Sequence, residues 1–227
     1  RDKPNMNKLN HIAFIMDGNG RWGRKKGKNR NFGHLKGVEV VKKIVKASIK
    51  FKIPVLSFYV FSSENWKRPK KEINFLFKLI NIYFLKEIDS LIKQNIKINI
   101  LGDLKPLPLN VKKILNRVTK LTKNNNTIKV NLALNYGARD EIIMAFKKIK
   151  KNLSKKQFEK NLFTKNMPNP DILIRTGGHK RLSNFLLWQL AYTELFFLEK
   201  LWPDFKVNDL EKIIKKYKTI KRNFGTI

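Results

Sequence analysis

Three short segments of the sequence combine arginines with glycines or with acidic and hydroxyl side chains, which are groups that proteins use to hold phosphate and metal ions. The first segment, residues 17–22, reads Asp-Gly-Asn-Gly-Arg-Trp and directly follows an apolar run. The second, residues 62–69, reads Ser-Ser-Glu-Asn-Trp-Lys-Arg-Pro, and the third, residues 175–183, contains two arginines, a Gly-Gly pair and a serine. Because arginine can bind phosphate oxygens through two parallel hydrogen bonds, the first and third segments are candidate anion sites.

The first segment is well suited to a phosphate group. Glycine lets successive backbone N–H groups point into one concavity, and Gly18 and Gly20 allow this here. Arg21, and Arg30 further on, can neutralise the phosphate charge. Asp17 is a lone carboxylate in this cationic region, and Mg²⁺ commonly binds a carboxylate together with phosphate oxygens. The alternative is a glycine-rich turn capped by an aspartate.

The glycines at 18, 20 and 23 also spell G-x-G-x-x-G, the fingerprint of dinucleotide-binding folds. That fingerprint needs an acidic residue about 20 positions further on, at the end of the next strand, to hold a ribose. Glu39 has this distance but falls inside a helical pattern, and bulky Arg21 and Trp22 occupy positions where the backbone must approach the ligand. The sequence also lacks the Gly-Lys-Ser/Thr of a P-loop. The segment therefore predicts a phosphate site of another kind.

Strands and helices alternate along the chain, which predicts an open, mainly parallel sheet with helices on both faces, in a single domain over residues 1–227. All three segments follow predicted strands, and such sheets bind ligands at the carboxyl ends of their strands. The predicted strands cover residues 12–16, 55–61, 96–101, 128–134, 172–174 and 195–198. The predicted helices cover residues 34–52, 69–94, 111–122, 138–149 and 208–217.

The helix predicted over residues 69–94 is apolar on nearly every face between Ile73 and Leu85. Such a helix is either buried in the core or lines an apolar cavity. Together with two phosphate sites and a divalent cation, a cavity of this kind would suit a substrate that has a diphosphate head and a long apolar tail.

Lysine and arginine outnumber acidic residues by 50 to 17, which gives a net charge of +33. This charge fits a polyanionic partner such as nucleic acid. The lysines are nevertheless spread along the chain, as a general compositional bias would produce. The chain has no cysteine, which excludes disulfides and cysteine-based zinc sites, and its apolar runs are too short for a membrane span. Because it starts at Arg1 rather than methionine, we expect a fragment or a processed form.

Several blocks between residues 11 and 205 resemble, in family order, the signatures of the cis-prenyltransferases, which are the undecaprenyl and dehydrodolichyl diphosphate synthases. Residues 11–22 resemble the first signature, and Gly33, His34 and Gly37 resemble the next. Residues 61–69 are similar to the block F-S-x-E-N-W-x-R-P. The remaining blocks are residues 135–137, 175–178, 181–189, Glu194 and 201–205.

The resemblance implies an apolar tunnel and a reaction in which isopentenyl diphosphate is added repeatedly, with cis geometry, to an allylic diphosphate such as farnesyl diphosphate. The product would be a long polyprenyl diphosphate for dolichol or polyprenol lipid carriers. Mg²⁺ is the implied cofactor, with Asp17 and Glu194 as ligands, and Asp17 and Asn65 are the implied catalytic residues. Because Asn65 is a neutral amide and therefore a poor base, we expect it to position the base or a water.

The same resemblance implies which residues bind the two substrates. The cradle for the allylic diphosphate would consist of Gly18, Asn19, Gly20, Arg21, Arg30 and His34. The residues around isopentenyl diphosphate would be Arg175, Arg181, Leu182 and Ser183. Two tryptophans, Trp22 and Trp66, would form part of the substrate-binding surface. The loop between the two substrates would be organised by Ser62, Ser63, Glu64 and Arg68.

The sequence departs from the family at His179 and Lys180, where the family usually has a glutamate first, and at Ala138, where a second glycine is usual. Any role of these positions in binding metal or ordering the loop is open. The tail at residues 222–225, Arg-Asn-Phe-Gly, resembles the family's ending, which lies near the partner's site in the dimer.

Family members are homodimers or pair with a non-catalytic homologue. Because the blocks around Asp17 and Arg175 are both intact, we expect a homodimer that works alone, soluble or bound peripherally to a membrane at a cytoplasmic or endoplasmic-reticulum face. The alternatives are a non-catalytic partner subunit and a nucleic-acid-binding protein. We expect no nucleic acid partner, because the aromatic residues lie in apolar runs and do not alternate with lysine on an exposed face.

Overall fold

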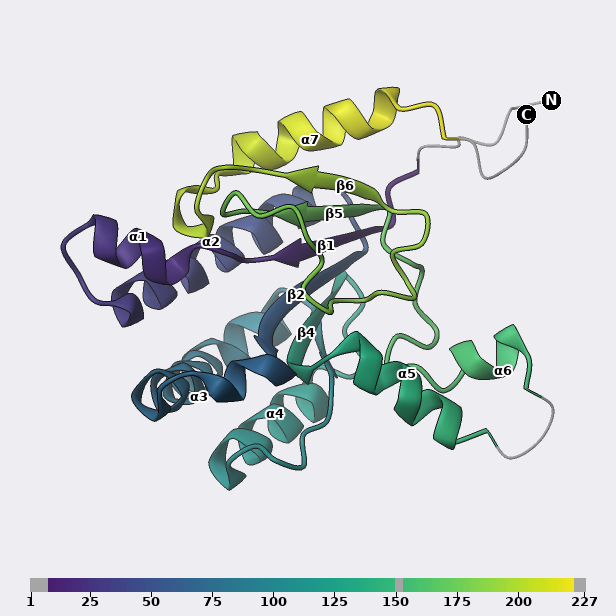
Figure 1. Cartoon of the computed structure of the whole chain (residues 1–227), viewed down its shortest axis with the longest axis horizontal. Coiled ribbons are helices and arrows are strands. Elements are labelled where there is room, and N and C mark those ends of the chain that lie inside the picture. Colours follow the sequence, from purple (N-terminus) through teal and green to yellow (C-terminus); the bar gives the residue numbers. More distant parts are fainter. Residues whose placement is uncertain (1–7, 150–152, 223–227) are drawn as a thin grey trace.

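The computed structural model describes residues 8–149 and 153–222, which form a six-stranded parallel sheet flanked by helices (Figure 1). The strand order is β3-β4-β2-β1-β5-β6, and each neighbouring pair is parallel. All six predicted strands are present. Their bounds are β1 (His11–Ile15), β2 (Val55–Ser62), β3 (Ile96–Leu101), β4 (Ile128–Tyr136), β5 (Ile172–Arg175) and β6 (Glu194–Phe197).

The five predicted helices are also present. They are α2 (Arg30–Lys50), α3 (Lys70–Lys93), α4 (Leu109–Leu121), α5 (Ala138–Lys147) and α7 (Val207–Thr219). Four short elements were not predicted, namely the helices α1 (Asn19–Lys25) and α6 (Lys155–Glu159) and the 3₁₀ helices η1 (Ser63–Lys67) and η2 (Trp202–Asp204). The α1 segment contains two glycines, which are unfavourable inside a helix, so its sequence resembles a loop.

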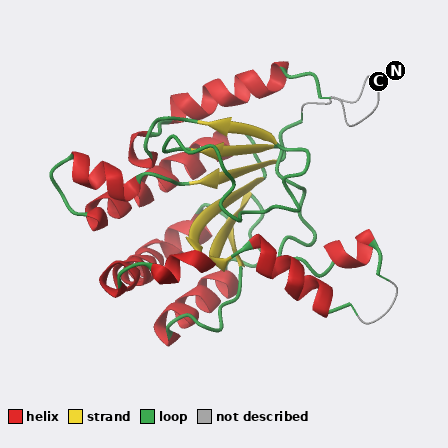
Figure 2. Ribbon diagram, viewed as in Figure 1, coloured by secondary structure: helices red, strands yellow, loops and turns green. Residues whose placement is uncertain are grey.

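Helices lie on both sides of the strands, as predicted (Figures 1 and 2). The larger core packs α2, α3, α4 and α7 against one face of the sheet. Alternate side chains of β1 pack on opposite faces of the sheet, with Phe14 in the larger core and Ile15 in the smaller one. The smaller core is closed by the start of α5 and by non-helical chain around residues 185–190. No helix in the described parts of the chain has the length and apolar character needed to cross a bilayer.

The strand register brings the three segments at residues 17–22, 62–69 and 175–183 to one edge of the sheet. Ile15 at the end of β1 pairs with Tyr59 on β2 and with Arg175 at the end of β5. The segments that follow these strands therefore leave the sheet side by side. This edge is the carboxyl edge, where open parallel sheets bind their ligands.

A close crossing between α1 and α2 fixes the position of the first segment. Gly33 in α2 lies so near α1 that a Cβ built on it would be 1.8 Å from the carbonyl oxygen of Asn19. Gly37 meets the Asn19 side chain in the same way, at 2.4 Å. Two glycines one helical turn apart thus let α1 rest directly on α2.

Replacing Gly33 with alanine is expected to lower the free energy of unfolding by about 1–3 kcal/mol, because α1 must move away from α2 to admit the new methyl group. Urea unfolding measures this loss. Lys43→Ala, an exposed change in the same helix, serves as the control and should cost less than about 0.5 kcal/mol. Equal stabilities of Gly33→Ala and Lys43→Ala would contradict the close crossing.

A buried polar chain crosses the middle of the sheet. His11 Nδ1 lies 2.8 Å from the carbonyl oxygen of Pro168, so this nitrogen carries the proton, and Nε2 then accepts a hydrogen bond from Ser57 Oγ at 2.7 Å. Asn131 donates to the same Ser57 oxygen at 3.0 Å. Burial lowers the pKa of His11 to about 4, so the imidazole is neutral in the folded protein at neutral pH.

Because His11 is buried in its neutral form, we expect the protein to lose stability in mild acid. The pKa of this histidine in the unfolded chain is about 6.5. Below that pH the unfolded state binds a proton that the folded state does not, so the free energy of unfolding falls between about pH 6.5 and pH 4, by about 2 kcal/mol at pH 5. Urea unfolding at pH 7.5 and pH 5 should show a smaller fall in His11→Gln than in the wild type. An equal fall in both proteins would contradict this assignment.

Candidate active site

Asp17 lies just beyond β1, between two arginines that come from different segments. Arg175, the last residue of β5, donates from Nη2 to Oδ2 of Asp17 at 3.0 Å. Arg21 in α1 donates from Nη2 to Oδ1 at 3.1 Å. The Arg175 side chain is 4% exposed, whereas that of Asp17 is 27% exposed and faces the cavity described below. The first and third segments therefore meet at this carboxylate.

Arg175 also fixes the loop that follows β5. Its Nη1 donates to Ser183 Oγ at 2.8 Å and to the carbonyl oxygen of Arg181. Ser183 and Asn184 have φ angles of 50° and 62°, in the left-handed region that residues other than glycine adopt only rarely. The Tyr59 hydroxyl lies 3.3 Å from the carbonyl oxygen of Ser183 and donates to it. These contacts hold a strained loop over the carboxyl edge of the sheet.

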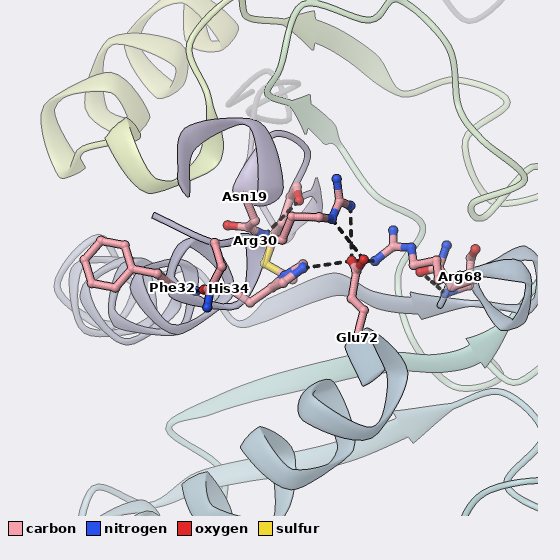
Figure 3. Close-up of polar contacts among 10 residues, drawn as sticks. Asn19, Arg30, Phe32, His34, Arg68 and Glu72 are labelled. Atoms are coloured by element: carbon pink, nitrogen blue, oxygen red, sulfur yellow. Dashed lines mark hydrogen bonds and ion pairs between the residues drawn. The ribbon is translucent and has the colours of Figure 1, made fainter. Parts of the chain in front are cut away.

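Glu72 joins three of the predicted substrate-binding residues to the start of α3 (Figure 3). Arg30 donates to both of its oxygens, from Nε at 2.9 Å and from Nη2 at 3.1 Å. His34 Nε2 lies 3.2 Å from Oε1, and Arg68 Nη1 donates to the same oxygen at 3.3 Å. The Glu72 side chain is only 8% exposed. One buried carboxylate thus holds two arginines and a histidine together.

The charges in this cluster follow from burial and from the hydrogen bonds. Burial raises the pKa of Glu72, but hydrogen bonds from Arg30 and His34 and the nearby positive charges outweigh it, so the pKa lies below its usual value. Burial lowers the pKa of His34, and the contact with Glu72 offsets only part of that effect. At neutral pH we therefore assign an ionised Glu72 and a neutral His34 that donates from Nε2.

The second segment forms η1 and borders the same space. Asn65 Oδ1 accepts from the Ser62 backbone N–H at 3.2 Å, which completes a capping box. The neighbouring residues tie η1 to two other segments, because Asn184 donates to Glu64 at 2.8 Å and Trp66 Nε1 donates to Asn135 at 2.8 Å. Ser63 Oγ approaches Gly137, where an added Cβ would lie 2.6 Å from it.

A polar cavity of about 210 Å³ collects side chains from all three segments. Its polar lining consists of Asp17, Asn19, His34, Ser62, Asn65, Arg68, Arg175 and Ser183. We call this space the head cavity of the site. It contains cations, hydroxyls and one partly exposed carboxylate, Asp17, which is the chemistry that a diphosphate bound with a divalent cation requires.

An apolar cavity of about 120 Å³ adjoins the head cavity and lies between α2 and α3. The two cavities share the lining residues Met16, Asn19, His34 and Val60. Further along, α3 contributes Leu76, Leu79 and Ile80 to its wall. The prediction that α3 lines an apolar cavity is confirmed for this face, whereas Ile82 and Leu85 on another face are 39% and 57% exposed.

Some predicted site residues lie outside this cluster. Trp22 donates a hydrogen bond from Nε1 to Asp204 Oδ1 at 2.8 Å, and its ring stacks on Phe32. Leu182 packs against the smaller core. Glu194 begins β6 and pairs with Ile172, so it lies at the opposite edge of the sheet from Asp17 within this chain. Of the tail at 222–225, residues 223–225 lie outside the described residues.

The glycines of the first segment have definite roles in the observed geometry. Gly18 has a φ of 107°, a left-handed conformation that glycine adopts readily, and it caps the start of α1. Gly20 lets Arg30 approach, because an added Cβ would lie 2.7 Å from the carbon of its guanidinium. The close glycine–arginine contact positions Arg30 to reach Glu72.

The donor set fits a magnesium ion that is held mainly by substrate and water. Asp17 supplies an oxygen ligand within the head cavity. Among the residues that the structure describes, no three or more histidine, cysteine or acidic side chains gather into a metal site. Mg²⁺ commonly binds one or two carboxylates together with substrate phosphates and water, so Asp17 would be the ligand from this part of the chain.

Sequence reasoning missed Glu72 and Tyr59, both of which hold site residues in place. Glu72 had a detectable signal, since it lies four residues after Arg68 in the first turn of a helix that follows Pro69, the spacing of a helical ion pair. Tyr59 had none, because its hydroxyl contact with Ser183 spans 124 residues of sequence.

Residues 15–225 match the family model described as "Putative undecaprenyl diphosphate synthase". An isoprenyl transferase of Oceanobacillus iheyensis is 44% identical over 227 residues, which cover 96% of this chain and 90% of that protein. The "Ditrans,polycis-undecaprenyl-diphosphate synthase ((2E,6E)-farnesyl-diphosphate specific)" of Buchnera aphidicola subsp. Schizaphis graminum is 45% identical over 229 residues, which cover 96% and 92%. The crystal structure of lavandulyl diphosphate synthase from Lavandula x intermedia, in complex with dimethylallyl diphosphate, has a TM-score of 0.93 at 32% identity, with 97% and 99% covered.

Proposed function

The chain belongs to the undecaprenyl diphosphate synthase family of prenyltransferases, and we propose that it adds isopentenyl diphosphate repeatedly, with cis geometry, to an allylic diphosphate such as farnesyl diphosphate. The observation that carries this proposal is the position of Asp17, between Arg21 and Arg175, in a polar head cavity that adjoins an apolar cavity. A diphosphate head and a prenyl tail match these two spaces in order.

The two diphosphates would occupy opposite sides of Asp17. The allylic diphosphate would meet α1, Arg21 and the arginines that Glu72 holds, with its prenyl tail directed along α3 into the apolar cavity. Isopentenyl diphosphate would meet the loop after β5, where Arg175 and Ser183 are joined by a hydrogen bond. Arg181 follows in the same loop.

The reaction breaks the bond between the allylic C1 and its diphosphate oxygen, and the electron pair leaves with the diphosphate. The double bond of isopentenyl diphosphate attacks C1 through C4, and loss of a proton from C2 creates the new double bond. Arg21 and nearby N–H groups stabilise the departing negative charge, where one preorganised donor can contribute about a hundredfold in rate. Asn65 positions a water that receives the proton. Mg²⁺, when bound at Asp17, supplies further charge neutralisation on the diphosphate.

We further propose that the protein is a homodimer, that its product is a long polyprenyl diphosphate for a dolichol- or polyprenol-type lipid carrier, and that it associates peripherally with a membrane to release that product. The intact Asp17 and Arg175 segments support an active subunit over a non-catalytic one. Activity of the purified chain without any homologous partner is the expected result.

Incorporation of labelled isopentenyl diphosphate into an extractable prenyl product tests this function. The purified protein is incubated with farnesyl diphosphate in the presence of Mg²⁺, and again with excess chelator or without farnesyl diphosphate. We expect incorporation only when both the primer and the metal are present. Salt-sensitive RNA binding without any incorporation would instead support the nucleic-acid-binding alternative.

A further inference from the structure

Asn184 follows Ser183 in the loop after β5, and it anchors that loop to the start of α5. Its Oδ1 accepts a hydrogen bond from the backbone N–H of Arg139 at 2.9 Å, and its backbone carbonyl accepts one from the N–H of Ala138 at 2.8 Å. Both donors lie in the first turn of α5, where N–H groups have no partner within the helix. Asn184 therefore caps α5 from a distant part of the chain.

The same amide group also contacts the second segment. Because the N–H of Arg139 can only donate, the amide oxygen of Asn184 must face it, and the amide nitrogen is left for η1. This Nδ2 donates to Glu64 Oε1 at 2.8 Å. Burial raises the pKa of Glu64, but hydrogen bonds from Asn184 and from nearby groups outweigh that effect, so the pKa lies below its usual value. Glu64 is thus ionised at neutral pH, and its carboxylate can only accept.

Gly137 shows how closely the three segments converge around this contact. A Cβ built on Gly137 would lie 2.7 Å from Asn184 Nδ2 and 2.6 Å from Ser63 Oγ. The end of β4, the loop after β5 and the first residues of η1 therefore meet at a point where a larger residue would have to displace one of them. The contact between Asn184 and Glu64 joins two of these segments directly.

The residues next to this hydrogen bond face the substrates. Ser183 precedes Asn184, and Asn65 follows Glu64, and both Ser183 and Asn65 line the head cavity. In the proposed reaction Ser183 meets the diphosphate of isopentenyl diphosphate, whereas Asn65 positions the water that receives a proton from C2 of the same molecule. The spacing between Ser183 and Asn65 must therefore match a single substrate, and the hydrogen bond one residue away fixes that spacing.

We propose that Asn184 is a positioning residue that aligns isopentenyl diphosphate with Asn65 through its hydrogen bond to Glu64. This inference rests on the proposed function, because it concerns the second substrate of the same reaction. The described residues that line the head cavity include Ser183 and Asn65 but not Asn184, so Asn184 acts through these two neighbours. The residues proposed for the allylic diphosphate are held separately, by Glu72 at the start of α3.

Exchanging the donor and the acceptor tests this role. Asn184→Asp keeps the size of the side chain and the oxygen that Arg139 requires, but it places a second carboxylate against Glu64. Adding Glu64→Gln supplies an amide that can donate to the new carboxylate, so the double variant has the same hydrogen bond in the opposite direction. Asn116→Asp, at an exposed position of α4, is the control for the change in charge. Urea unfolding confirms that each variant is folded, and kcat and the KM of each substrate are measured with Mg²⁺ present.

We expect Asn184→Asp to lower kcat/KM for isopentenyl diphosphate by about tenfold, because a small misplacement of reacting groups has a large effect on rate. The KM for farnesyl diphosphate should stay within about twofold of the wild type, and the double variant should recover kcat/KM to within about threefold. Asn116→Asp should match the wild type.

Three outcomes would overturn the inference: unchanged kinetics in Asn184→Asp, equal losses toward both substrates, or a double variant as impaired as Asn184→Asp. Asn184 would then be only a capping residue of α5. Absence of any incorporation by the wild type would instead refute the proposed function.

Discussion

Replacing Asp17 with asparagine is expected to lower kcat for prenyl transfer by at least about a hundredfold. The carboxylate lies in the head cavity between Arg21 and Arg175, where the diphosphate would depart. Asparagine keeps the shape of the side chain and one acceptor oxygen, but it removes the negative charge that would hold Mg²⁺ beside the diphosphate. Steady-state kinetics with farnesyl diphosphate, isopentenyl diphosphate and Mg²⁺ measures the effect.

Two measurements separate a chemical role of Asp17 from a structural one. Urea unfolding should show a loss of about 1–3 kcal/mol, since the one remaining side-chain oxygen can accept from only one of the two arginines. Asp89→Asn, at an exposed position of α3 far along the chain from the site, should retain wild-type kcat. Near-normal turnover of Asp17→Asn at saturating Mg²⁺ would contradict the metal role. A larger loss of stability would place Asp17 among the structural residues instead.

Replacing Glu72 with alanine is expected to lower the free energy of unfolding by about 2–3 kcal/mol. The change leaves Arg30 and Arg68, whose side chains are about one third exposed, without their shared carboxylate, and it removes the acceptor of the buried His34. It also detaches the first turn of α3 from α2. Glu39→Ala is the matched control, because Glu39 forms an exposed pair with Lys36 on α2 and should cost no more than about 1 kcal/mol.

Inorganic pyrophosphate provides a second test of the Glu72 cluster. If its cations bind the allylic diphosphate, an added anion should take the place of the missing carboxylate. Pyrophosphate should then raise the thermal midpoint of Glu72→Ala by more than it raises that of the wild type, at matched ionic strength. Equal shifts in both proteins would indicate that this cluster supports the fold but does not bind the diphosphate.

The sequence was sufficient to predict the sheet and the edge at which the site lies. The apolar strands carry strong local signals, and parallel strands place the segments after β1, β2 and β5 at the same edge. Asp17 could be singled out because a carboxylate beside glycines and arginines has few structural uses. The family resemblance, which rested on those segments, is confirmed by the match over residues 15–225.

Other features depend on contacts between distant parts of the chain. Helix α1 escaped prediction because its stability comes from packing on Gly33 and Gly37, which outweighs its poor helix propensity. The left-handed Ser183 is held by Arg175 and Tyr59, and nothing in the local sequence indicates that conformation. The apolar cavity likewise depends on where α2 lies against α3, a distance that periodicity cannot supply.

The most direct test of the central claim is the geometry of the double bond that the protein makes. The purified chain is incubated with farnesyl diphosphate, Mg²⁺ and ¹³C-labelled isopentenyl diphosphate, and the extracted product is examined by NMR. The proposed function predicts that each new double bond is cis, and that Asp17→Asn under the same conditions yields at most about a hundredth of the product. New double bonds with trans geometry, or no coupling of the two substrates at all, would contradict it.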